Sequence, residues 1–442
     1  METLHLLLWN RDNIDQSIRP RIFRQELLPV PTYRFEIFHL DLEESSGTTA
    51  RDLGLYQIPL RSERSFRIDT LDIRFLFDDN LLYEASLGAS EDRVRALTAL
   101  RRVAASNEHR GLDEYKKILP CGASWMLVRP DYIHILKDCE SHQGVYETQE
   151  RVRRHMRGNE GKTEARRFDR TRFVVTGEGG IGKTWLLSYI LVDRLLKGLV
   201  TVYVSSTGEH TLFTPDGVSS FQSDEVNTFK LFMIKKGYLT DSNVWYLTDT
   251  VPAEFVTLQK EGCKWRIVET RRGDRDPLFD EGIGAKKVLR YMRLWEWHEI
   301  FLVADYEQKL TMYESSRLYK CFKRYDPVPR ILLDILNPTY SEAEFQPKEE
   351  ALKSKMYKEI SILVKEFQHQ RLESVNELAT VCGKYKDSHG FYVFPLDPEG
   401  QGYYLMRKRH VSKYAAWAFY KITGKGGWDI WGYKGLRPEA TW

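Results

Sequence analysis

The stretch that decides the fold is Phe173-Val-Val-Thr-Gly-Glu-Gly-Gly-Ile-Gly-Lys-Thr184. It opens with a short apolar, β-branched run, which predicts a β-strand that Thr176 closes. Residues 177–184 then match the pattern G-x-x-x-x-G-K-[ST] in full. Residues 185–196 are apolar on most of the helical circumference, as in a helix packed against a sheet. Strand, glycine-rich loop and helix in this order predict a loop that binds the phosphates of a nucleotide.

Each part of the motif has a physical reason. Glycines let the loop wind back so that successive backbone N–H groups face phosphate oxygens, and the helix start adds its positive dipole end. Lys183 would reach the β- and γ-phosphates, and the Thr184 hydroxyl would coordinate Mg²⁺. The predicted nucleotide-binding residues are Gly177, Glu178, Gly179, Gly180, Ile181, Gly182, Lys183, Thr184 and Trp185.

The same stretch also matches the dinucleotide fingerprint G-x-G-x-x-G through Gly177, Gly179 and Gly182. That fingerprint needs an acidic residue about 20 positions further on, at the end of the second strand. Here the second strand, over residues 200–204, runs into Ser205, and the first acidic residue is Glu209. A dinucleotide site also has no use for the Lys-Thr pair, so the phosphate-loop interpretation is preferred.

A second Gly-Lys-Thr occurs at residues 161–163. It lacks a glycine five positions earlier, where Met156 stands, and arginine-rich polar sequence precedes it instead of a strand. We therefore do not interpret it as a phosphate loop.

A phosphate-loop enzyme needs an acid at the end of a neighbouring apolar strand to hold the magnesium shell. The run Val244-Trp-Tyr-Leu-Thr-Asp249 offers Asp249 for that role, as a metal residue together with Thr184. The next residue is Thr250, so the acid that often serves as general base beside the metal acid is missing. Three alternatives follow: hydrolysis is slow, it uses an acid from elsewhere in the chain, or it does not occur.

A further apolar strand, over residues 265–268, ends in Glu269-Thr-Arg-Arg272. Glu269 is the candidate for the missing base, because a polar group at this strand end lies near the γ-phosphate in such an architecture. Arg271 is a candidate for neutralising charge in the transition state. A basic surface turn remains an alternative for the two arginines.

Composition sets limits on partners and compartment. The chain has 442 residues, with 66 basic and 63 acidic side chains, so its net charge of +3 does not by itself call for nucleic acid or membrane. The five cysteines are far apart and form no Cys-x-x-Cys pair, which favours a reducing, intracellular compartment. No apolar run approaches the roughly 20 residues of a membrane span. The apolar start, residues 1–9, indicates a first β-strand.

Residues 151–172 form a local exception to the balanced charge. They contain nine arginines and lysines against three acidic residues. Such a segment is either an electrostatic contact with nucleic acid or a solvated helix and linker ahead of the core. Nucleic acid is therefore a predicted partner through this segment alone.

The predicted fold class is α/β, with a three-layer phosphate-loop NTPase core. Three parts are expected: an N-terminal α+β accessory domain over 1–115, the NTPase domain over 116–345, and a mixed, helix-rich C-terminal region over 346–442 that would serve as a lid. The sequence leaves the oligomeric state undecided.

Several stretches, in order along the chain, resemble the P-loop ATPase module of Crinkler and retrotransposon hot spot (RHS) proteins of eukaryotic microbes. They span about residues 125 to 335 and comprise residues 128–132, 177–203, 213–218, 244–250, 291–295 and 325–330. The resemblance implies ATP as the nucleotide with Mg²⁺. It also implies a location in the nucleus, where some members of the family act as effectors.

We therefore expect a nucleoside triphosphate, ATP by the resemblance, to be bound and hydrolysed, driving a conformational change in the flanking segments. Two alternatives remain open. One is a nucleotide-dependent switch with little turnover, and the other is a nucleic-acid-associated effector remnant without nuclease activity. The residues themselves do not choose between ATP and GTP.

Overall fold

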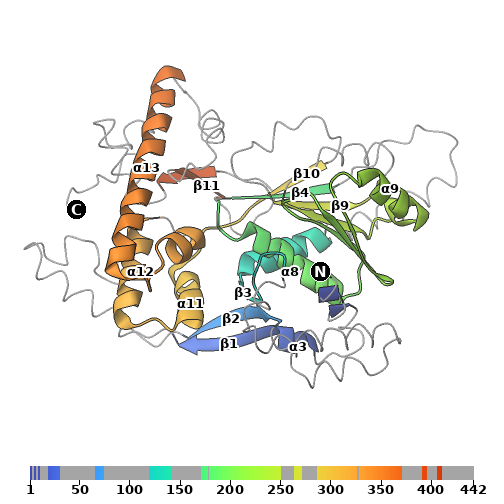
Figure 1. Cartoon of the computed structure of the whole chain (residues 1–442), viewed down its shortest axis with the longest axis horizontal. Helices are drawn as coiled ribbons and strands as arrows, with labels where there is room; N and C mark the ends of the chain where they lie inside the picture. Colours follow the sequence, from blue (N-terminus) through green and yellow to red (C-terminus); the bar gives the residue numbers. More distant parts are fainter. Residues whose placement is uncertain are drawn as a thin grey trace, which may run out of the picture.

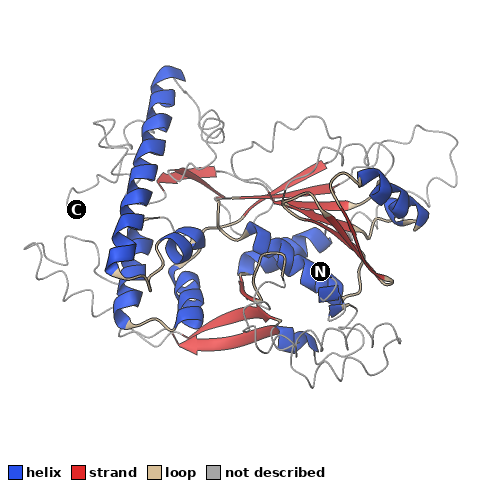
Figure 2. Cartoon of the chain, viewed as in Figure 1, coloured by secondary structure: helices blue, strands red, loops and turns tan. Residues whose placement is uncertain are grey.

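The computed structural model describes residues 1, 4–5, 8–9, 18–29, 65–73, 119–141, 171–177, 179–249, 263–270, 286–325, 328–370, 391–395 and 406–410. Figure 1 shows a central sheet with helix α8 packed beneath it and the long helix α13 standing to one side. Figure 2 separates the same elements by secondary structure. The fold is mixed α/β with a sheet rich in parallel strands, which confirms this part of the prediction.

The central sheet has seven strands among the described residues, in the order β10-β4-β9-β8-β5-β6-β7. The first five run parallel to one another, and β6 and β7 form an antiparallel hairpin at the edge. The strands are β4 (Thr171–Thr176), β5 (Thr201–Val204), β6 (His210–Thr214), β7 (Gly217–Phe221), β8 (Trp245–Thr248), β9 (Arg266–Thr270) and β10 (Lys286–Tyr291). Because parallel strands share one direction, the carboxyl ends of β4, β9 and β8 lie at the same edge.

Alternating side chains give the sheet two apolar faces. On one face, strand residues such as Trp245 and Val268 pack with α8 (Lys183–Leu196), the helix over residues 130–141 and α11 (Trp297–Gln308). On the other, residues such as Tyr246 and Ile267 pack with α9 (Val226–Lys235) and the 3₁₀ turn Tyr238–Thr240. Helical segments therefore pack on both faces of the sheet.

A smaller antiparallel sheet precedes the core, with the strand order β1-β2-β3. Its strands are β1 (Phe23–Pro29), which follows the short helix α3 (Ile18–Ile22), β2 (Ser65–Asp72) and β3 (Trp125–Val128). The pairing of β2 with β3 crosses the predicted boundary at residue 115. The division into three domains stays a prediction.

The start of the chain is helical where it is described, so the strand predicted for residues 1–9 is wrong. His5 N–H donates to the carbonyl of Met1, and Trp9 N–H donates to that of His5, which is the i to i−4 pattern of a helix. Leu4 and Leu8 are both fully buried. Their spacing of four places them on one helical face. The helical period was not visible in the sequence because most residues of this short run are apolar.

Helices dominate the described part after β10. They are α11, α12 (Met312–Arg324), the π-helical turn η5 (Arg330–Ile335) and α13 (Glu342–Gln370). Helix α13 contains Pro347 in its second turn, where proline removes one intrahelical hydrogen bond, and it runs across the predicted boundary at 345/346. A two-stranded sheet, β11 (Phe391–Pro395) with β12 (Met406–His410), follows. None of the described helices is long and apolar enough to cross a membrane.

Candidate phosphate-binding site

The glycine-rich loop joins the carboxyl end of β4 to the start of α8, as predicted. Gly180 and Gly182 have φ angles of +86° and +95°, in a region that other residues rarely adopt. Space is also closed there: a Cβ on Gly180 would lie 2.7 Å from the Cβ of Arg330, and a Cβ on Gly182 would meet the hydroxyl of Tyr132. Both positions therefore require glycine for two independent reasons. Glu178 lies outside the described residues.

Helix α8 begins at Lys183, so the loop leads directly into a helix N-terminus. The first N–H groups of a helix have no intrahelical partner, and the dipole adds partial positive charge. The Lys183 side chain is buried, and its Nζ donates a 2.8 Å hydrogen bond to the carbonyl of Gly177. This contact holds the ammonium across the loop, where phosphates would lie. At its other end α8 ends at Leu196, and Gly198, with a φ angle of +64°, turns the chain out of the helix.

Three oxygen-bearing side chains meet beside the loop. The Thr184 hydroxyl donates to the Asp249 carboxylate, with Oγ1 3.2 Å from Oδ1 and 3.1 Å from Oδ2. The hydroxyl of Thr270 donates to Oδ1 of the same carboxylate. Thr184 and Asp249 were predicted as a pair from the sequence, and the structure brings them together. Thr270 was not singled out.

This cluster suits magnesium chemically. Mg²⁺ takes oxygen ligands and is usually held by one or two carboxylates together with substrate phosphates. Thr184 and Asp249 are both half-buried, so the pair is not sealed inside the core. Thr184 would bind the ion directly and Asp249 would complete its shell, with Thr270 orienting the carboxylate.

The strand order explains how the cluster forms. Strand β9 lies between β4 and β8, so the strand that carries Asp249 is not the immediate neighbour of the loop strand. In the register, Val175 is paired with Thr270, and Thr248 with Glu269. The last residue of β9 therefore stands between the loop and Asp249. The sequence does not reveal this insertion, since all three strands look alike in it.

Glu269 lies on the other face of the sheet. Side chains alternate along a strand, so Thr270 shares the face of α8 whereas Glu269 shares the opposite face with Ile267. There its carboxylate forms a buried ion pair with Arg172 of β4, with Nε 2.7 Å from Oε2. The catalytic role predicted for Glu269 stays a prediction, and the structure gives this side chain a partner inside the core.

Other predicted residues fall outside the described part of the chain. These are Arg271, its neighbour at 272, Thr250, the Gly-Lys-Thr at 161–163 and most of the basic segment. Arg172, the last residue of that segment, is described and buried in its ion pair with Glu269. It is therefore not part of a surface that could meet nucleic acid.

Two further predicted loop residues face the protein. The Ile181 side chain is fully buried in the core, so only its backbone is available to a nucleotide. Trp185 is partly buried against the same core. If these residues contact a nucleotide as predicted, Ile181 can do so only through its backbone, and Trp185 only through the exposed part of its side chain.

Arg330 is a charged residue at the loop that the sequence reasoning did not select. It starts the π-helical turn η5, and its side chain is exposed. Its Nε would lie 3.3 Å from a Cβ placed on Gly180, so the guanidinium rests against the loop. In the sequence, the only signal for this residue was its place in a Pro-Arg turn (residues 329–330). That this turn lies against the glycine-rich loop can be seen only in the fold.

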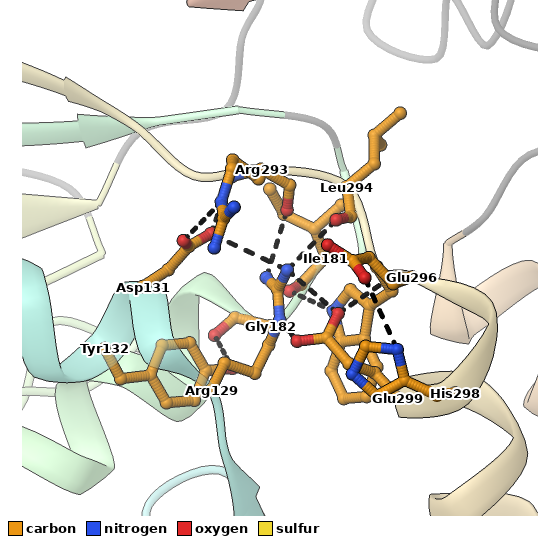
Figure 3. Close-up of polar contacts among 11 residues, drawn as sticks. Arg129, Asp131, Tyr132, Ile181, Gly182, Arg293, Leu294, Glu296, His298 and Glu299 are labelled. Atoms are coloured by element: carbon orange, nitrogen blue, oxygen red, sulfur yellow. Dashed lines mark hydrogen bonds and ion pairs between the residues drawn. The ribbon is translucent and has the colours of Figure 1, made fainter. Parts of the chain in front are cut away.

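The loop is also held on its protein side by two buried aromatic side chains, Tyr132 and Trp295. Figure 3 shows Tyr132 beside Gly182. Tyr132 donates its hydroxyl to the carbonyl of Gly182 at 3.0 Å, and Trp295 donates Nε1–H to the carbonyl of Ile181 at 2.9 Å. Tyr132 lies in the first turn of the helix over 130–141, and Trp295 lies just before α11. The loop thus contacts segments that precede and follow it in the chain.

No protein-family model matches the chain, and no curated protein matches it. Solved structures similar to it include three variant forms of RuvB from Thermotoga maritima. Two are 14% identical, cover 64% of this chain and 90% of their own, and have TM-scores of 0.30 and 0.29. The third is 12% identical, covers 60% of this chain and 89% of its own, and has a TM-score of 0.30. A likeness at this level of identity and TM-score shows nothing about function.

These comparisons overturn the resemblance to Crinkler and RHS proteins. The similar structures are RuvB chains, and neither a family model nor a curated protein of that kind matches. The matching stretches are mainly the loop, its helix, the following hairpin and the strand before Asp249. Any phosphate-loop α/β core places such apolar and glycine-rich segments there, so they do not identify one family. The nuclear location was implied only by this resemblance and therefore has no support.

Proposed function

We propose that this chain binds a nucleoside triphosphate with Mg²⁺ at residues 177–184 and hydrolyses it to drive a conformational change. The observation that carries the proposal is the meeting of Thr184, Asp249 and Thr270 beside the loop. These side chains come from three separate elements, and a merely structural glycine turn needs none of them. Their convergence supports a built site for phosphate and metal.

In this proposal the chain's own groups divide the work. The loop N–H groups and the α8 N-terminus bind phosphate oxygens, and Lys183 moves from the Gly177 carbonyl to the β- and γ-phosphates. Magnesium, when bound, neutralises charge on the phosphates. Thr184 and Asp249 would hold the ion beside the loop.

Arg330 links the site to the C-terminal helices. Its guanidinium rests against Gly180, and η5, which it starts, lies between α12 and α13 in the chain. A cation at this position would bind the γ-phosphate and release it after hydrolysis. Its movement would be transmitted to η5 and α13, which gives the predicted lid a physical connection to the nucleotide.

A nucleotide-dependent switch with little turnover is the second candidate. It is favoured by the residue after Asp249, which is Thr250, and by the ion pair that holds Glu269 on the far face of the sheet. Among the described residues, the hydrogen bonds at Thr184 involve one acid, Asp249, which is already proposed for the metal, so no second acid is assigned as general base. The two candidates differ only in whether phosphate is released.

The experiment compares wild type with Lys183→Ala and Asp249→Asn for binding of ATP and GTP and for phosphate release. Lys183→Ala should weaken nucleotide binding about 10- to 100-fold, because it removes a charge-assisted contact to phosphate. Asp249→Asn should keep binding in the absence of Mg²⁺ and lose its enhancement by Mg²⁺. Wild-type protein that binds neither ATP nor GTP would refute the proposal. Binding without phosphate release would decide for the switch.

A further inference from the structure

The two peptide groups that Tyr132 and Trp295 contact lie at the turn of the loop into α8. Tyr132 binds the carbonyl of Gly182 and Trp295 binds that of Ile181. A trans peptide is planar, with its C=O and N–H pointing in opposite directions. Holding the carbonyl of residue 181 therefore aims the N–H of residue 182 to the other side. In the same way, holding the carbonyl of residue 182 aims the N–H of Lys183.

We propose that Tyr132 and Trp295 are positioning residues, which turn these two N–H groups toward the phosphates by binding the carbonyls behind them. The inference rests on the proposed nucleotide site and adds to it two side chains that orient the backbone of the loop. Neither residue belongs to the glycine-rich motif. Neither side chain would touch the nucleotide, since both approach the loop from its protein side.

Both donors are held firmly. Tyr132 is fully buried, and burial raises the pKa of its hydroxyl above the ordinary range, so it stays protonated and able to donate. Trp295 is almost fully buried, and the guanidinium of Arg129 lies over its ring, 5.0 Å from the centroid. The carbonyl of Gly182 also accepts the first helical bond from Leu186, which its second lone pair permits.

Arg129 fixes the segment that carries Trp295. Its Nη1 and Nη2 donate to the carbonyls of Arg293 and Leu294, each at 3.0 Å. Its Nε and Nη2 also bind the carboxylate of Glu299 at 3.1 and 3.2 Å. Glu299 in turn accepts from the N–H of Glu296 and closes a capping box at the start of α11. Figure 3 shows Arg129 at the centre of these contacts.

Asp131 completes the cluster from the other side. It accepts from the backbone N–H of Arg293 at 2.9 Å and from its Nε at 2.7 Å. The cluster thus contains two buried or half-buried cations and two carboxylates, paired with one another. Buried pairs often add little stability but can specify one geometry, and removing one partner is costly. Here the specified geometry places Tyr132 and Trp295 behind the loop.

Gly182 supplies an independent sign of this docking. A Cβ at that position would collide with the Tyr132 hydroxyl. The last glycine of the motif is therefore needed for the approach of Tyr132 as well as for its positive φ angle. A loop that merely had to turn would not need a tyrosine packed against this glycine.

The test uses Tyr132→Phe and Trp295→Phe in the full chain, with Tyr246→Phe as the matched control. Tyr246 is equally buried, and its hydroxyl bonds His210 on the far face of the sheet. Each positioning variant should weaken nucleotide binding about fivefold, the value of one hydrogen bond. Amide hydrogen exchange in residues 179–184 of the nucleotide-free protein should also become faster. The control should lose similar thermal stability and change neither readout.

Unchanged loop exchange and unchanged affinity in both positioning variants would overturn the inference. An equal loss in the Tyr246→Phe control would do so too, because the effect would then be general destabilisation. The exchange readout does not depend on a nucleotide. If wild type bound no nucleotide while loop exchange still responded to Tyr132→Phe, the proposed function would fail and the positioning would stand.

Discussion

The hydroxyl of Thr270 donates a hydrogen bond to the carboxylate of Asp249, joining the ends of two parallel strands. One strand lies next to the phosphate-loop strand, and the other lies beyond it. The same carboxylate accepts from Thr184 of the loop helix. Asp249 is thus oriented from both sides by hydroxyl groups of the chain itself. Hydrogen-bond partners of this kind fix the geometry of a carboxylate that helps to hold a metal.

Removing the Thr270 hydroxyl should therefore weaken the affinity of the site for Mg²⁺. We expect Thr270→Val to raise the Mg²⁺ concentration for half-maximal phosphate release about tenfold, since second-shell partners of metal ligands have effects of that size. Nucleotide binding without metal should be unchanged. Thr248→Val, a buried threonine of β8 on the opposite face, is the control, and an equal shift there would contradict the role of Thr270.

Arg330 should matter for turnover more than for binding. Arg330→Ala should lower the rate of phosphate release about a hundredfold, the scale for losing one electrostatic contact in the transition state. Nucleotide affinity should fall much less, and Arg330→Lys should recover part of the rate. Arg324→Ala, an exposed arginine of α12 paired with Glu349, should leave both unchanged. A rate in Arg330→Ala equal to wild type would exclude the proposed contact.

The ion pair between Arg172 and Glu269 should govern stability. Glu269→Gln should reduce the free energy of unfolding by about 3–5 kcal/mol, because it leaves a buried guanidinium without its charge partner. The double variant Arg172→Met with Glu269→Leu should recover much of that loss. Denaturant unfolding measures both. A Glu269→Gln protein of normal stability that binds nucleotide but releases no phosphate would instead show Glu269 to be the general base.

Two buried thiols should make the protein sensitive to high pH. Burial raises the pKa of Cys139 and of Cys321 to about 12, from an ordinary value near 9. Between these values the folded state keeps protons that the unfolded state loses, so stability falls as pH rises. Thermal unfolding at pH 8 to 11 should show this decline, and Cys139→Ala with Cys321→Ala should flatten it. A decline of equal slope in the double variant would refute the assignment.

The basic segment gives a prediction that the described residues do not test. If residues 151–170 contact nucleic acid, DNA binding should weaken steeply with salt. Replacing Arg151, Arg153, Arg154 and Arg157 with glutamine should lower the slope of that dependence. Replacing Lys235 and Lys236, at the C-terminal end of α9, should leave the slope unchanged. A salt dependence that survives the four arginine replacements would rule out this segment as the contact.

The sequence by itself determined the local parts of this protein. The strand before the loop, the loop, helix α8 and its glycine stop all follow from short-range rules: β-branched runs, positive φ at glycine and helical apolar spacing. The pairing of Thr184 with Asp249 could also be predicted, because both follow from one chemical need at one sheet edge. The apolar start shows the limit, since a run of nine residues fits a strand or a helix equally well.

Only the tertiary structure decided which strand lies beside which, and hence which side chains share a face. The insertion of β9 brings Thr270 to Asp249, and the alternation of its side chains takes Glu269 to Arg172. Tyr132, Trp295 and Arg330 reach the loop from 50 residues or more away in the chain. Local sequence carries no signal for such contacts, because they depend on how whole elements pack.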